Sequence, residues 1–276
     1  MRGVTAATYE LARPPWRDRL AYQLRVLRVI ARTQFKLKYV DSFLGYVWSL
    51  AKPLSYFGVL WVVFGKFFNT GIARFPLYLL IGIVLYTFMF DAVGAALPSI
   101  LERGPLLRRI AFPPLVIPVS ATLTAAMTFG VNLLAVSVFV AATRITPHLS
   151  WLLLIPLLLQ LYLFVLGLAL VVSTLFVRFR DIGPIWELSA QLMLFAAPVM
   201  YPITILPTWA QHVEMANPFV QILQDVRRVV IGHQEKLGSL ATSAAWHAVP
   251  LAVTAGMLLL GLWVHLRDAP YFAEKV

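Results

Sequence analysis

Few side chains in this sequence could make or break bonds, and those few stand far apart. The sequence contains no GxxxxGK(S/T) phosphate loop, no HExxH zinc motif and no Gly-x-Ser-x-Gly nucleophile elbow. The absence of cysteine excludes disulfides, thiolate metal sites and a cysteine nucleophile. The five histidines are scattered along the chain, so no metal site is predicted. We therefore expect no catalytic residue, no metal and no cofactor in this chain.

Basic side chains are the most numerous charged groups, with 23 Lys and Arg against 12 Asp and Glu. Four of them recur at i, i+3, i+7 and i+11, which forms one stripe of a helix over residues 18–38. These four are Arg25, Arg28, Arg32 and Lys36. Apolar residues cover most of the remaining circumference, which predicts an amphipathic helix along the inner membrane surface. A simple surface anchor and a contact with a partner subunit or anionic headgroup explain this stripe equally well.

The elements that must position these residues are membrane-spanning helices. Hydrophobic residues make up 60% of the chain and charged residues 13%, whereas soluble domains carry about a quarter charged residues. Several apolar stretches reach the ~20 residues that a helix needs to cross the hydrocarbon layer. We predict an all-α membrane protein with six spans. They lie at about 47–68, 76–98, 113–142, 150–177, 183–202 and 245–266.

The positions of the basic residues predict the topology. Seventeen of the 23 Lys and Arg lie on the side of the two termini, and six lie on the other side. This asymmetry places both termini of a multi-pass protein in the cytoplasm. We divide the chain into a cytoplasmic N-terminal segment (1–45), a six-helix transmembrane domain (46–266) and a cytoplasmic tail (267–276). Residues 1–45 lack the apolar core of a signal peptide.

The outer region between spans five and six is too long for a simple connector. Asn217-Pro218 is a good helix start, since it combines an N-cap residue with proline at the first helical position. Gly232 can end this helix. The apolar face between them predicts a short re-entrant helix that dips into the outer leaflet or caps an exit. A helix that lies on the surface without a gating role explains the pattern as well.

Two segments facing the cytoplasm resemble a known family. Residues 39–54 (YVDSFLGYVWSLAKPL) fit the pattern Y-x-x-S-x-L-G-x-x-W-x-x-x-x-P-L at every fixed position. Residues 99–118 (SILERGPLLRRIAFPPLVIP) have the order Leu, basic, Phe-Pro, Pro. These segments resemble the permease subunit of type-2 ABC transporters that export lipid-linked polysaccharide or polyol phosphate. The family includes exporters of O-antigen, teichoic acid and galactan, and the resemblance covers nearly the whole chain.

The resemblance implies a cytoplasmic coupling helix between spans two and three, which seats in a groove of a separate ATPase subunit. Chain-breaking residues at Gly104-Pro105 and at 112–114 delimit this short element. Its candidate contact residues are Glu102, Arg103, Leu106, Leu107, Arg108 and Arg109. Positive charge retained on the cytoplasmic side is the alternative explanation for the arginines. The family also implies a homodimer that assembles with two ATPase subunits, and these subunits bind ATP and Mg. Nucleic acid is not an expected partner.

A polysaccharide path needs aromatic faces, and the carrier's pyrophosphate needs cations at the inner interface. Phe57, Trp61 and Phe64 share one face of span one at i, i+4 and i+7. The candidate channel residues are Tyr56, Phe57, Trp61, Phe64 and Phe88. The candidate headgroup residues are Arg25, Arg28, Arg32, Lys36, Lys38 and Lys52.

These features predict the transmembrane subunit of an exporter in the bacterial inner membrane. Its expected substrate is a polyprenyl-pyrophosphate-linked polysaccharide of the O-antigen or cell-wall galactan type. A drug or lipid exporter of the same architecture is an alternative. A membrane enzyme acting on polyprenyl-linked sugars is a weaker one, because Glu102 and Asp181 near the inner loops have no acidic neighbour.

Overall fold

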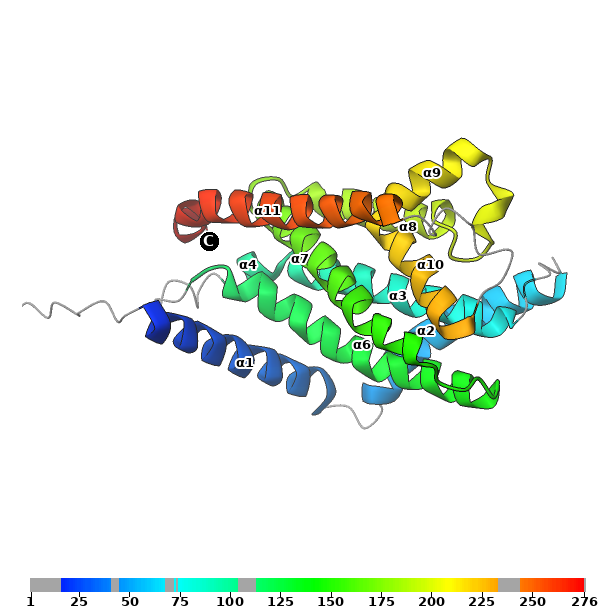
Figure 1. Cartoon of the computed structure of the whole chain (residues 1–276). Coiled ribbons are helices and arrows are strands. Elements are labelled where there is room, and N and C mark those ends of the chain that lie inside the picture. Colours follow the sequence, from blue (N-terminus) through cyan, green and yellow to red (C-terminus); the bar gives the residue numbers. More distant parts are fainter. Residues whose placement is uncertain are drawn as a thin grey trace, which may run out of the picture.

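The computed structural model describes residues 16–40, 45–67, 72, 74–103, 113–232 and 244–275, and their regular elements are all helices (Figure 1). The longer helices are α1 (Trp16–Val40), α2 (Gly45–Leu60), α3 (Phe75–Ala96), α6 (Val116–Ala142), α7 (Leu154–Arg178), α8 (Ile182–Ala196), α10 (Pro218–Ile231) and α11 (Ala244–Lys275). The shorter ones are the π-helix η1 (Trp61–Phe67), α4 (Ser99–Glu102), the 3-10 turns η2 (Leu149–Leu153) and η3 (Ile203–Ile205), and α9 (Thr208–Ala216). The prediction of an all-α protein is confirmed.

Five helical stretches in the described part of the chain are long and apolar enough to cross a membrane. They are Val47–Phe67, Phe75–Ala96, Val116–Ala142, Leu149–Arg178 and His247–Phe272. Each corresponds to one predicted span. Most of their first and last residues agree with the prediction within three residues. The start of α1 and the end of α11 lie at the same end of the bundle (Figure 1). We call this the termini end and the opposite one the far end.

The fifth predicted span, 183–202, is shorter than expected. Helix α8 has 15 residues, which is about 22 Å of helix against a hydrocarbon layer of about 30 Å. It stops because Pro198 forces the preceding residue, Ala197, into an extended conformation. The Tyr201 hydroxyl then donates to the carbonyl of Phe195 at 3.2 Å and to that of Ala196. Six full spans are therefore not observed among the described residues, where five spans and one short apolar helix stand instead.

Helix α3 forms the centre of the bundle. Most of its side chains are buried, as expected for a helix that is apolar around its whole circumference. It packs against α2, α6, α7, α8 and α10. Side chains that α3 presents in different directions therefore reach different neighbouring helices, and this central position organises the sites described below.

Helices α7 and α11 approach each other closely at two glycines. A Cβ atom built on Gly261 would lie 2.5 Å from the carbonyl oxygen of Gly167, and one built on Gly167 would lie 2.7 Å from the amide nitrogen of Leu258. Two glycines thus allow the backbones to touch, which is how membrane helices gain packing energy without a hydrophobic driving force.

Helix α1 includes the predicted segment 18–38 and runs beside the first half of α6 (Figure 1). Its apolar side chains Val26, Leu27 and Ile30 pack on Val116 and Ile117. Further along, the Thr124 hydroxyl of α6 lies 3.1 Å from the Gln34 amide oxygen. The existence of this helix is confirmed, and its position on the inner membrane surface stays a prediction.

Helix α10 begins and ends as predicted. The Asn217 side chain accepts a hydrogen bond of 3.0 Å from the Phe219 amide, which is N-capping geometry. Gly232 follows the last turn with φ of 95°, a conformation that suits glycine. Its polar side as well as its apolar side lies inside the bundle. The re-entrant position of this helix and its role at an exit stay predictions.

Candidate functional site

Three helices meet near the termini end around the aromatic residues of α3. The ring of Phe90 stacks on Tyr86 of the same helix and on Trp186 of α8, with both centroid distances 6.3 Å. From α2, the ammonium of Lys52 lies 5.2 Å from the Phe90 ring centre. We call Tyr86, Phe90 and Trp186, together with Lys52 and its partner Asp91, the aromatic face.

An ion pair adjoins the rings of the aromatic face. Lys52 Nζ lies 2.7 Å from the Asp91 carboxylate, and the two side chains are 45% and 30% exposed. The cation predicted to bind a headgroup is therefore already paired within the chain. Because both groups remain partly exposed, a stronger anion such as pyrophosphate could compete with the carboxylate for Lys52.

One polar group of the aromatic face has a hydrogen-bond partner, and another has none among the described residues. The Tyr86 hydroxyl donates to the Ala190 carbonyl at 2.8 Å and so ties α3 to α8. The buried Nε1–H of Trp186 has no acceptor among the described residues. Flat aromatic faces with a spare donor and a nearby cation are the groups that a sugar with an anionic carrier would use.

The predicted channel residues separate into buried and exposed ones. Phe57 is 8% exposed, because its ring packs edge-on against Phe139 at 5.2 Å. Phe88 is buried in the same way, with its ring 4.6 Å from that of Phe129. Both therefore belong to the packed interior of this chain. Of the predicted set, Tyr56 and Trp61 are exposed on α2 and η1, at 49% and 37%, and Phe64 is partly buried.

The aromatic stripe of span one does not continue as predicted. Trp61 stacks on Phe57 at 6.3 Å, as the i, i+4 spacing requires in an α-helix. From Trp61 onward the chain winds as a π-helix, whose wider turn moves Phe64 away from the α-helical register. The Lys66 ammonium of this π-helix lies 5.8 Å from the Trp61 ring.

The predicted coupling segment is described only at its start. Glu102 is exposed, whereas Arg103 is half-buried and its Nη1 donates to the Ser120 hydroxyl of α6 at 3.1 Å. Burial lowers the pKa of the Arg103 guanidinium, and the neighbouring Glu102 opposes this shift. Arg103 thus anchors the segment to the bundle. The remaining predicted contacts, Leu106, Leu107, Arg108 and Arg109, lie outside the described residues.

The basic stripe of α1 is where the spacing predicts it. Arg25, Arg28, Arg32 and Lys36 are all exposed on one side of the helix. The last two of these residues, with Val29, Thr33 and Phe35, line a shallow depression. The side chain of Lys38, another predicted headgroup residue, lies outside the described part of the chain.

Sequence analysis did not find the arginine that is fully buried among the described residues. Arg227 of α10 is fully buried and donates to the carbonyls of Tyr78, Pro198 and Val199 at 3.1, 2.7 and 2.6 Å. In the sequence, Arg227 follows the apolar Leu223 by four residues in an amphipathic helix. This pattern does not indicate which groups would accept its hydrogen bonds. Those acceptors are backbone atoms from α3 and from the break after α8.

A second polar cluster links α7, α10 and α11. Gln160 donates to Gln221 at 3.1 Å, Gln221 donates to Asp225, and the His247 ring lies 3.2 Å from the Asp225 carboxylate. Gln160 is a polar residue within the long apolar helix α7, and such residues typically form interhelical hydrogen bonds. The cluster fits that structural role.

Comparison with known proteins identifies the family. A family model for ABC-2 type transporters matches residues 25–230. Two O-antigen export system permease proteins RfbA of Klebsiella pneumoniae are 27% and 26% identical over 205 and 211 residues, which cover 74% and 76% of this chain and 79% and 82% of theirs. A permease protein RfbA for O-antigen export in Myxococcus xanthus is 28% identical over 247 residues, 88% of this chain and 90% of its own. The resemblance drawn from residues 39–54 and 99–118 is thereby confirmed.

Proposed function

This chain belongs to the ABC-2 type transporter family, and we propose that it exports a polyprenyl-pyrophosphate-linked polysaccharide of the O-antigen or galactan type. It is a membrane-spanning permease subunit rather than an enzyme. The observation that carries the proposed substrate is the similarity to three O-antigen export permeases along most of the chain. The bacterial inner membrane is the proposed location, with both termini in the cytoplasm.

ATP hydrolysis belongs to a second polypeptide in this proposal. The sequence has no phosphate loop, so two copies of an ATPase subunit would bind ATP and Mg. They would dock on residues 102–112, which connect α4 to α6 at the termini end. Arg103, held by Ser120 at 3.1 Å, would transmit movement of this segment to α6. Such coupling works only if the ATPase binds the segment differently in its two states.

The aromatic face and its flanks are the proposed path. Helices α2 and α8 flank α3 at Phe90 and expose large apolar side chains. These include Tyr56 on α2, Trp61 on the η1 that continues it, and Leu188, Leu192 and Phe195 on α8. Such a surface needs a partner or lipid to cover it. We propose that two copies of the chain face each other across it and that the glycan passes between them.

Recognition of the carrier is assigned to cations at the termini end. The stripe Arg25, Arg28, Arg32 and Lys36 is exposed, and each basic group near a membrane surface contributes about 1 kcal/mol to binding an anionic headgroup. Lys52 would receive the pyrophosphate by exchanging Asp91 for it. The glycan next to the headgroup would then meet the rings of Phe90 and Trp186.

Purification with the cognate ATPase tests this function. We expect the two subunits to co-purify and the ATPase rate of the complex to rise with added lipid-linked polysaccharide. Small hydrophobic drugs are the matched comparison. A rise caused by drugs and not by the glycan would instead favour a drug or lipid exporter of the same architecture. Failure of any ATPase to bind would contradict the assignment as a transporter subunit.

Alanine substitution of the exposed Trp61 and the partly buried Trp186 tests the path. Trp61→Ala and Trp186→Ala should lower export several-fold while the complex with the ATPase still forms. Phe57 is a poor probe, because it is packed against Phe139 and its loss would disturb folding. Unchanged export in both variants would remove the aromatic face from the path.

A further inference from the structure

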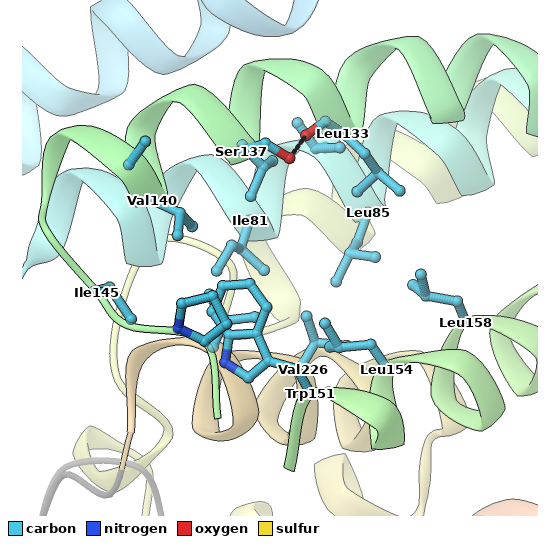
Figure 2. Close-up of a pocket in the computed structure, with 15 residues that line it drawn as sticks. Ile81, Leu85, Leu133, Ser137, Val140, Ile145, Trp151, Leu154, Leu158 and Val226 are labelled. Atoms are coloured by element: carbon cyan, nitrogen blue, oxygen red, sulfur yellow. Dashed lines mark hydrogen bonds between the residues drawn. The ribbon is translucent and has the colours of Figure 1, made fainter. Parts of the chain in front are cut away.

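The far end of the bundle contains an apolar cavity of about 510 Å³ (Figure 2). It lies between α3, α6, the start of α7 and α10, and its lining includes Ile81, Leu85, Val140, Leu154 and Val226. The Ser137 hydroxyl at its wall already donates to the Leu133 carbonyl at 2.9 Å. Such an apolar lining suits hydrocarbon better than water.

A basic pocket of about 330 Å³ adjoins this cavity. Ile145 and Val230 line both spaces. The pocket is also lined by Arg74, Arg144, Arg228, His148, Thr146 and Ser150, and none of the described residues that line it carries a carboxylate. Three arginines from three separate elements therefore converge at the mouth of an apolar cavity.

Two of these arginines occupy backbone positions at which arginine is unfavourable. Arg144 (φ 54°) follows α6 in a Schellman motif, in which its amide donates to Ala141 and the next amide donates to Val140. Glycine is the usual residue there, because the left-handed conformation costs other residues energy. Arg74 (φ 57°) precedes α3 without capping it through its side chain. Arg74 Nη1 also donates to the Ile231 carbonyl at the end of α10, at 3.4 Å. The local backbone conformation nevertheless requires an arginine at neither position.

We propose that the cavity and the basic pocket together bind one anionic phospholipid of the bilayer. One acyl chain fills the cavity, and the phosphate lies among Arg74, Arg144 and Arg228. Arginine suits this task because its planar fork pairs with phosphate through two parallel hydrogen bonds. Charge complementarity selects an anionic headgroup over a zwitterionic one. This site is distinct from the aromatic face, and its occupancy does not depend on which glycan is exported.

Trp151 provides a direct readout, because its indole lines the cavity (Figure 2). The full-length protein is reconstituted into phosphatidylcholine vesicles with increasing brominated phosphatidylglycerol, and tryptophan emission is recorded. Bromine on an acyl chain quenches an indole that it touches. The signal from this site is the difference between the wild type and Trp151→Phe, which removes the contribution of the other tryptophans. Brominated phosphatidylcholine at the same fraction is the matched lipid.

We expect brominated phosphatidylglycerol to quench Trp151 at lower lipid fractions than brominated phosphatidylcholine. Arg144→Gly should lower this preference about fivefold, and combination with Arg74→Gln should lower it by roughly 25-fold. Because glycine suits the backbone at residue 144, the first variant should fold at least as well as the wild type. Arg180→Gln, at an exposed arginine near the termini end, should leave the preference unchanged.

Ala141→Phe tests the cavity itself, because it places a ring in the space that the acyl chain would fill. It should weaken quenching by both lipids. Equal quenching by the two lipids in the wild type, or a preference for phosphatidylglycerol that Arg144→Gly leaves undiminished, would overturn the proposal. So would displacement by polyprenyl phosphate that exceeds displacement by unbrominated phosphatidylglycerol, since the site would then belong to the carrier lipid.

Discussion

The guanidinium of Arg227 lies 3.4 Å from the centre of the Tyr78 ring, and the whole residue is buried. Its charge faces the π-electrons of that ring and three backbone carbonyls, two of which belong to the break after α8. Charged side chains inside membrane proteins are costly unless they pair with one another or with carbonyls. This arginine therefore joins α3, α10 and the end of α8 into one unit.

Replacing Arg227 should destabilise the fold. Arg227→Met leaves the Pro198 and Val199 carbonyls without this donor, at about 1–3 kcal/mol for each group that stays buried and unsatisfied. The Tyr78 carbonyl keeps its partner within α3. We expect the apparent unfolding temperature in detergent to fall by about 5 °C or more. Arg227→Lys should also destabilise, because an ammonium cannot reproduce the planar fork.

The neighbouring Arg228 is the control for this substitution. It is only partly buried, so Arg228→Met should shift the unfolding temperature much less. An Arg227→Met variant as stable as the wild type would show that the three hydrogen bonds contribute nothing net.

Gly82 makes the space that Arg227 occupies. A Cβ atom at residue 82 would lie 2.5 Å from Arg227 Nη2 and 3.2 Å from the Val199 carbonyl oxygen. The guanidinium cannot move aside without losing its hydrogen bonds, so Gly82→Ala should destabilise the protein measurably. Gly94→Ala on the same helix meets nothing closer than 3.9 Å and should be neutral or stabilising by up to about 1 kcal/mol. Equal unfolding temperatures for the two variants would contradict this packing.

The α7–α11 contact can be tested in the same way. Gly261→Ala would bring a methyl group to 2.5 Å from the Gly167 carbonyl oxygen, whereas nothing lies within 4 Å of a Cβ at Gly256. We expect Gly261→Ala to separate the helices and lower the unfolding temperature, while Gly256→Ala leaves it unchanged or raises it. Cysteine pairs introduced across the two helices would report the separation through their rate of disulfide formation. A rate unaffected by Gly261→Ala would contradict the close contact.

Helix α10 shows which parts of the fold could be predicted from the sequence. Its start at Asn217-Pro218 and its end at Gly232 follow from local backbone chemistry, and the structure has both. The burial of its polar residues could not be predicted. It depends on the partners Gln160, His247 and the Tyr78 carbonyl, which come from distant parts of the chain. Local patterns carry no information about such partners.

The residues of the candidate site could likewise be predicted only where local helical periodicity determines their position. The stripe of basic residues on α1 depends only on helical periodicity, and it is exposed as expected. Composition indicated aromatic residues in span two, but it could not distinguish Phe88, which faces α6, from Phe90, which faces α8. That distinction depends on how α3 is rotated within the bundle. The change from α to π winding at Trp61 likewise has no clear sequence signal.

Phe88 and Phe90 should therefore give opposite results. Phe88→Ala removes a ring packed 4.6 Å from Phe129 and should cost about 3 kcal/mol of stability. Phe90→Ala removes a partly buried ring of the aromatic face and should lower export more than stability. Unfolding temperature and cellular export are measured for both variants at matched protein levels. A stable Phe88→Ala variant with impaired export would instead place the path on the α6 side of α3.

The central claim is that this chain forms a passage for a lipid-linked glycan and takes its energy from a separate ATPase. The most direct measurement is translocation in proteoliposomes that contain the chain and its cognate ATPase, with the polysaccharide carrier added to one side. We predict that glycan reaches the opposite side only when ATP and the ATPase are both present. Translocation without the ATPase, or ATP hydrolysis by the purified chain alone, would contradict the account.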